Sequence, residues 1–126
     1  MRTLPATYHI DRSTRTVFLA VVGQIDLAQI ADVGQRLRQD PDFDPAFQEL
    51  LDLQGMAPPN LHYPDLHLMA HEIDPFPATS RRALVAPDAL AFGLARMYQM
   101  IHGDDNIRVF RSRPAALEWL GLPEDG

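Results

Sequence analysis

The stretch RRALVAPDALAFGLARMYQMIHG (residues 81–103) joins a strand to a helix, and this junction decides the fold. Residues 82–86 are mostly small and apolar, which is the pattern of a strand covered on both faces. Pro87 and Asp88 follow, and both residue types favour the first turn of a helix. Gly103 is placed to end that helix. A strand that leads directly into a helix is the repeating unit of an α/β sheet.

The same alternation is predicted along the rest of the chain. Strands are predicted at residues 7–10, 16–23, 46–53, 82–86 and 106–110. Helices are predicted to begin after Asp26, at Pro64, at Pro87 and at Pro114. A short polar turn makes the first two strands an antiparallel hairpin, and helical connections make the others parallel. The sequence therefore predicts a single α/β domain over residues 1–126, with a mixed, mostly parallel five-stranded sheet, an N-terminal hairpin and four helices (β-β-α-β-α-β-α-β-α).

Composition excludes several functional classes. Hydrophobic residues make up 46% of the 126 residues and charged residues 22%, which is typical of a globular protein. Without cysteine, the chain has no disulfide, thiolate nucleophile or cysteine-bound zinc. The net charge of −6 disfavours binding to nucleic acid. No apolar run approaches the roughly 18 residues that a membrane helix needs, and no signal-peptide core precedes residue 16, so we expect a cytoplasmic protein without membrane insertion.

The sequence carries no motif for catalysis or for a cofactor. GxSxG, GxGxxG and the phosphate-binding P-loop are all absent. His67 and His71 stand four residues apart, with Asp74 three further along and His62 just before the predicted helix, a spacing that can hold a metal. No HExxH glutamate lies between the histidines, and they flank the apolar stripe. We expect no metal, cofactor or catalytic residue, and whether these histidines bind anything is left open.

One carboxylate stands out as a candidate ligand-binding residue. The loops after three predicted parallel strands meet at one edge of the sheet, where α/β proteins place ligands. Asp52 lies there between Leu51 and Leu53, and a carboxylate in apolar surroundings needs partners or access to water. We therefore predict Asp52, Gln54 and Met56 as ligand-site residues.

The helix predicted after Pro87 is apolar on two sides. At about 100° per residue, one stripe is predicted to face the sheet. It contains Leu90, Gly93, Leu94, Met97 and Ile101. The other side is predicted to bind a partner or a second copy of the chain, because it is aromatic and small where a surface helix would be charged. It contains Phe92, Ala95, Arg96 and Tyr98. The alternative is that neighbouring helices of the same chain cover it.

Four segments, GQID, LLDL, ALVAPDALAFGLARMYQ and VFRSRPAALEWLG, together resemble the SpoIIAA-like branch of the STAS/SEC14-type domains. The resemblance spans roughly residues 8–121 and implies a mixed five-stranded sheet with packed helices. Better-known STAS proteins are anti-sigma-factor antagonists, which bind a partner protein and are switched by phosphorylation of a serine or threonine just past the third strand. Here residues 52–66, DLQGMAPPNLHYPDL, contain neither residue, so that switch does not carry over.

Three functions remain, in order of preference. The first is a non-enzymatic protein-interaction or regulatory domain that binds a protein partner or forms a homodimer. The alternative is a SEC14-like binder of a small apolar or amphipathic ligand between sheet and helices. An apolar cavity lined by Met56, Met69, Met97 or Met100 would favour that alternative. The third, a hydrolase or isomerase, requires a cleft that joins Asp52 to a histidine.

Overall fold

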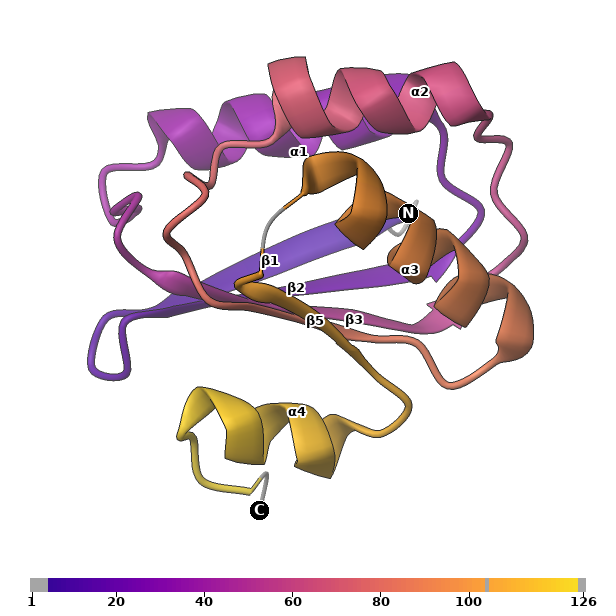
Figure 1. Ribbon diagram of the computed structural model, residues 1–126. Helices are drawn as coiled ribbons and strands as arrows, with labels where there is room; N and C mark the ends of the chain where they lie inside the picture. Colours follow the sequence, from indigo (N-terminus) through magenta and orange to yellow (C-terminus); the bar gives the residue numbers. More distant parts are fainter. Residues whose placement is uncertain (1–4, 104, 125–126) are drawn as a thin grey trace.

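The computed structural model describes residues 5–103 and 105–124, which form one mixed sheet with helices on both faces (Figure 1). Its strands are β1 (Ala6–Asp11), β2 (Thr16–Gly23), β3 (Gln48–Met56), β4 (Arg82–Val85) and β5 (Ile107–Phe110). Its helices are α1 (Leu27–Gln39), α2 (Tyr63–Leu68), α3 (Ala89–His102) and α4 (Arg113–Leu120), and α2 continues into a π-helical turn, η1 (Met69–Ile73). Spatial order follows chain order, with β1–β2 antiparallel and all other pairs parallel. The predicted fold class is confirmed.

The helices are divided unequally between the two faces of the sheet. Helices α1, α2 and α3 lie with η1 on one face, and α4 lies alone on the other (Figure 1). Because β-α-β connections are almost always right-handed, three connections that step across the sheet in one direction place their helices on one face. The face under α4 has its own core, which includes Leu50, Val85 and Leu117.

Helix boundaries follow the predicted capping residues. The Asp26 carboxylate accepts the backbone N–H of Gln29 at 2.9 Å, and the Gln29 side chain accepts the backbone N–H of Asp26 at 2.9 Å. This reciprocal pair satisfies two N–H groups that the helix leaves open. The Asp88 carboxylate caps α3 with a single hydrogen bond, which it accepts from the backbone N–H of Ala91 at 2.8 Å. Gly103 ends α3 at φ 68°, a left-handed conformation that favours glycine.

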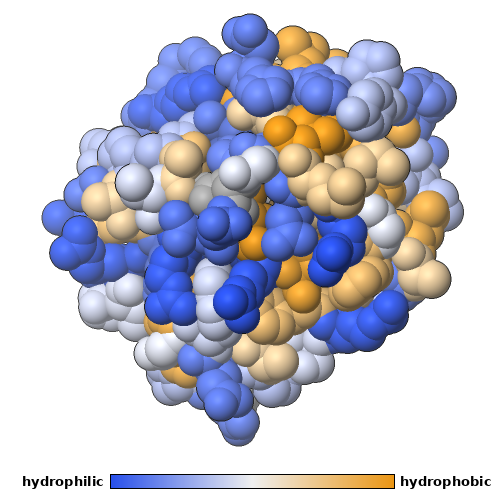
Figure 2. Space-filling model, in the orientation of Figure 1, coloured by the Kyte–Doolittle hydropathy of each residue, from blue (hydrophilic) through white to orange (hydrophobic). Residues whose placement is uncertain are grey.

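The predicted orientation of α3 is wrong in part, because Leu90, Gly93 and Met97 of the predicted inward stripe are exposed, whereas Leu94 and Ile101 are partly buried. Ala91 and Ala95 face the sheet and are buried, whereas Leu90, Met97 and Met100 are 51%, 40% and 74% exposed. Figure 2 shows apolar side chains on this side of the molecule. Because both sides of the helix are apolar, hydrophobic periodicity does not choose between them. The side with the alanines packs on the sheet, because small side chains let the helix backbone approach the strands closely.

The four predicted partner-binding residues therefore do not share one exposed surface. Ala95 belongs to the core, and Tyr98 packs against that core. Phe92 is half-buried, and its ring lies 4.1 Å from the guanidinium carbon of Arg111, a cation–π contact. Of the four, only Arg96 is exposed. The chain itself therefore covers much of this side of the helix, and a partner-binding role for the four residues stays a prediction.

Replacing two helical glycines with alanine should change the free energy of unfolding in opposite directions. A Cβ on Gly34 in α1 would lie 3.0 Å from the Ile73 carbonyl oxygen, whereas a Cβ on Gly93 in α3 would meet nothing within 4 Å. We expect Gly34→Ala to lower the free energy of unfolding by about 1–2 kcal/mol, because crowding outweighs improved helix propensity. Gly93→Ala should raise it by about 0.5–1 kcal/mol. Urea unfolding measures both, and shifts of equal sign would contradict the packing described here.

Candidate functional site: an apolar cavity with a charged end

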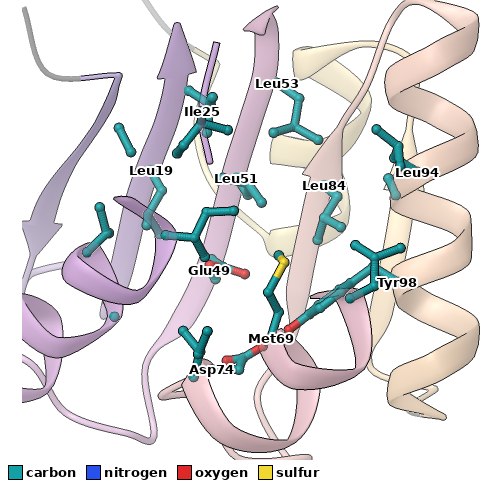
Figure 3. Close-up of a pocket in the computed structure, with 18 of the residues that line it drawn as sticks. Leu19, Ile25, Glu49, Leu51, Leu53, Met69, Asp74, Leu84, Leu94 and Tyr98 are labelled. Carbon is teal, nitrogen blue, oxygen red and sulfur yellow. Dashed lines mark hydrogen bonds between the residues drawn. The ribbon is translucent and has the colours of Figure 1, made fainter. Parts of the chain in front are cut away.

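A partly enclosed cavity of about 170 Å³ lies between the sheet and the helices α1, α2 and α3. An engineered apolar cavity of about 150 Å³ in another protein binds benzene, so this space can hold a small ring. Its walls are mainly apolar (Figure 3) and include Leu19, Ile25, Leu51, Leu53, Leu84 and Leu94. The strands supply one wall, and the inner faces of the helices supply the other.

The three predicted ligand-site residues are divided between the two faces of the sheet. Met56 lines the cavity. Asp52 lies on the α4 side, where its Oδ2 atom accepts a hydrogen bond from Arg113 Nη1 at 3.0 Å. Gln54 is exposed, and its backbone N–H donates to Asp52 Oδ1 at 2.9 Å. Asp52 and Gln54 are therefore removed from the candidate site, because the carboxylate already has its partners on the other face.

A bulge in β3 explains this division. Ala20 of β2 pairs with Asp52, but Val22 pairs with Gly55, so β3 contains one residue more than β2 over this stretch. An inserted residue shifts the alternation of side chains between the two faces. Met56 consequently joins the wall to which Leu53 belongs. The sequence does not reveal this shift, because it arises only when two strands pair.

Four polar residues line one end of the cavity: Glu49, Asp74, Arg82 and Tyr98. Figure 3 labels Glu49, Asp74 and Tyr98 among them. Arg82 Nε donates to Glu49 Oε1 at 2.9 Å. Arg82 Nη1 lies 2.6 Å from Asp74 Oδ2, an ion pair. The Tyr98 hydroxyl donates to the same Asp74 oxygen at 2.5 Å. The side chains of Glu49, Asp74 and Arg82 are only 4–5% exposed, so this is a buried ionic network at the edge of apolar space. We call these four residues the charged end.

Electrostatics distinguish the roles of the four groups. Burial raises the pKa of Glu49 and outweighs the opposing effect of Arg82. Burial, reinforced by Asp74, also raises the pKa of Tyr98, so its phenol stays neutral. Burial alone would lower the pKa of Arg82, but Glu49 and Asp74 together keep it above its usual value. Arg82 therefore stays charged, and the buried carboxyl of Glu49 is protonated more readily than that of an exposed glutamate, because its pKa is raised.

The π-helical turn brings Asp74 to this end. The Asp74 backbone N–H donates to the Met69 carbonyl at 2.9 Å, an i→i+5 bond that widens the turn. Met69 and Asp74 both line the cavity as a result. Turns of this type occur frequently at functional sites. The sequence instead suggested that Asp74 shares a surface stripe with His67 and His71.

The histidines lie apart from the charged end. The rings of His67 and His71 stack at 5.8 Å between centroids, and His62 occupies the N-cap of α2. Within residues 5–103 and 105–124, no group of three histidine, cysteine or acidic side chains is arranged to hold a metal ion. In the same part of the chain, no helix has the length and apolar character needed to cross a bilayer.

Sequence reasoning missed the central pair of this site. Neither Glu49 nor Arg82 was singled out as a site residue, yet both are only 4% exposed. They are direct neighbours across the parallel β3–β4 pair. The sequence did contain a signal for this pair. Glu49 and Arg82 carry opposite charges and lie in two predicted strands, 46–53 and 82–86, whose other residues are mostly apolar. Such charges require each other, because a buried charge needs a partner.

Comparison with known proteins identifies the fold. No family model matches the chain, and no curated protein matches its sequence. A crystal structure from Shewanella loihica PV-4, an uncharacterised protein of the DUF3478 family with a SpoIIAA-like fold, is similar with a TM-score of 0.65. The similarity covers 95% of this chain and 97% of that chain, at 17% sequence identity. At this identity it establishes architecture rather than activity: the chain has the SpoIIAA-like α/β fold that its sequence motifs resemble.

Proposed function

We propose that this protein is a non-enzymatic domain that binds a small, mainly apolar molecule between its sheet and helices. The observation that carries the proposal is the cavity of about 170 Å³ with one charged end. Protein interiors are close-packed and contain few voids larger than a water molecule. A space of this size with mainly apolar walls and a few polar groups at one end has the character of a small-molecule site.

The position of the methionines supports ligand binding. Met56 and Met69 line the cavity, as expected for the binder of an apolar ligand, whereas Met97 and Met100 lie outside it. Methionine side chains adapt to irregular apolar surfaces. A hydrolase or isomerase built from Asp52 and a histidine receives no support, because Asp52 pairs with Arg113 on the opposite face of the sheet.

Titration with toluene tests this function. We expect toluene to shift the backbone amide NMR signals of Leu51, Leu53 and Leu84 in a saturable way, because these residues line the cavity. Toluene should also raise the melting temperature, since a ligand at 100 times its dissociation constant stabilises the folded state by about 2.7 kcal/mol. Linear shifts confined to the exposed face of α3 would contradict the proposal.

A second candidate function, binding to a protein partner or to a second copy of the chain, is favoured by exposed apolar side chains. Leu68 of α2 is 42% exposed. On α3, Leu90 is 51% exposed, Met97 is 40% exposed and Met100 is 74% exposed. Leu90, Met97 and Met100 recur at helical spacing, and contiguous apolar surface often marks an interaction site.

Analytical ultracentrifugation of Met97→Glu/Met100→Glu tests this second candidate. If the chain is a homodimer through this surface, the variant becomes a monomer and keeps its circular dichroism, because the substituted side chains are exposed in the monomer. Gln35→Glu/Gln39→Glu, at two exposed positions of α1, is the matched control because it introduces the same two negative charges away from α3. A wild-type protein that is monomeric at all concentrations would contradict self-association.

A further inference from the structure

We propose that the cavity selects a small apolar molecule that carries a protonated amine, and that it disfavours a carboxylic acid of the same size. The inference rests on the proposed function, because it specifies the ligand of the same cavity. It follows from three properties of the charged end: an unpaired acceptor, the balance of charge, and the size of the adjacent apolar space.

The unpaired acceptor is on Glu49. Its Oε1 atom accepts from Arg82 Nε at 2.9 Å, and its Oε2 atom has no hydrogen-bond partner among the residues that the structure describes. The Glu49 side chain is 5% exposed and lines the cavity. A carboxylate oxygen beside apolar space is costly unless a donor reaches it. The Tyr98 hydroxyl donates to Asp74, so its own oxygen also keeps the capacity to accept.

An ammonium group matches this end of the cavity. It carries three N–H donors and no acceptor. Glu49, Asp74 and Tyr98 all line the cavity and offer oxygen atoms from three different elements, as Figure 3 shows. A charge-assisted hydrogen bond to a carboxylate is about twice as strong as a neutral one. The amine nitrogen would therefore sit at Glu49, with the apolar part of the ligand among the leucines.

The balance of charge disfavours an acid. Arg82 is shared between two carboxylates, and its guanidinium carbon lies 4.9 Å from the Phe76 ring centroid. Two further basic groups lie near Asp74. His102 Nε2 is 3.9 Å from Asp74 Oδ2, and the exposed Arg38 donates from Nη2 to the Asp74 backbone carbonyl at 3.2 Å. With Glu49 ionised, as it is when it pairs with a ligand ammonium, the buried group of Glu49, Asp74, Arg82 and His102 carries one excess negative charge when His102 is neutral and none when His102 is protonated. Neither state offers an excess positive charge to a ligand carboxylate.

Size excludes long chains. A cavity of about 170 Å³ is close to the one of about 150 Å³ that accepts benzene, and it is below the usual range of about 300–1,000 Å³ for drug-sized ligands. A single ring or a short branched chain fits, whereas a long acyl chain does not. The ligand class is therefore a small aromatic or branched aliphatic amine.

Four probes with one ring and different head groups test this inference: toluene, benzylamine, benzyl alcohol and benzoate. Each is titrated into the full chain at neutral pH and followed by amide NMR shifts. We expect benzylamine to bind at least about tenfold more tightly than benzyl alcohol, and benzoate to bind most weakly. Glu49→Gln should lower the affinity for benzylamine about tenfold more than it lowers the affinity for toluene. The control Glu72→Gln removes an exposed carboxylate outside the cavity. It should change neither the affinity for benzylamine nor the affinity for toluene.

The outcomes separate this inference from the proposed function. If toluene does not bind, the proposed function fails. If toluene binds and benzoate binds as tightly as benzylamine, the function stands and the amine inference fails. If Glu49→Gln does not fold, nuclear Overhauser effects on the wild-type complex decide: contacts from the benzylamine methylene to Glu49 support the inference, and contacts to Ile25 and Leu53 overturn it.

Discussion

Replacing Arg82 with methionine lowers the free energy of unfolding by about 3–5 kcal/mol. Arg82 is 4% exposed and lies between Glu49 and Asp74, at 2.9 and 2.6 Å from their oxygens. Its removal leaves two buried carboxylates without the cation that they share, and methionine supplies similar volume but no charge. Urea unfolding measures the effect. The matched control is Arg12→Met, which removes an exposed ion pair with Asp42 and should cost no more than about 1 kcal/mol.

The same variant should become more stable as the pH falls. Burial raises the pKa of Glu49 in the folded state above its unfolded value, and loss of Arg82 removes the main effect that opposes this rise. A group with a raised folded pKa contributes stability below its unfolded pKa, about 4.3 for glutamate, and loses it as pH rises through the folded pKa. Arg82→Met should therefore gain stability on acidification from about pH 7 to pH 5. A variant with wild-type stability, or one that loses stability over this range, would contradict a buried ionic network.

Filling the cavity should remove ligand binding without unfolding the protein. Ala95 on α3 is 3% exposed and lines the cavity, so Ala95→Leu places three more carbon atoms into it. We expect the affinities for toluene and benzylamine to fall at least about tenfold, and the free energy of unfolding to change by less than about 1.5 kcal/mol, because the space is available. NMR titration and urea unfolding measure the two quantities.

Ala89→Leu is the matched control for this substitution. Ala89 begins the same helix and is exposed, so the added carbons reach solvent rather than the cavity. This variant should bind both probes as the wild type does. Unchanged binding by Ala95→Leu would show that the probes occupy another place, and the cavity would lose its proposed role.

The fold was predictable because its determinants are local. Asp26 and Asp88 accept N–H groups three residues away, and Gly103 ends α3 through its own backbone conformation. Such features can be read within one turn of a helix. The strand at residues 82–86 and its neighbours were recognised in the same way, by composition over a few residues.

The site was less predictable because it depends on how distant segments pack. Glu49 and Arg82 are 33 residues apart and meet only through strand register. Met56 reaches the cavity only because β3 contains a bulge. The two sides of α3 are both apolar, so the choice of Ala95 rather than Met97 as the inward residue was decided by packing distance. Hydrophobic pattern fixes which elements form, but three-dimensional pairing determines which side chains meet.

The most direct test of the ligand site is a crystal structure of the protein with benzylamine. The predicted result places the ring against Leu51 and Leu84, with the amine nitrogen about 2.7–3.2 Å from Glu49 Oε2. A cavity filled by the protein's own side chains, or benzylamine bound only outside it, would contradict the account.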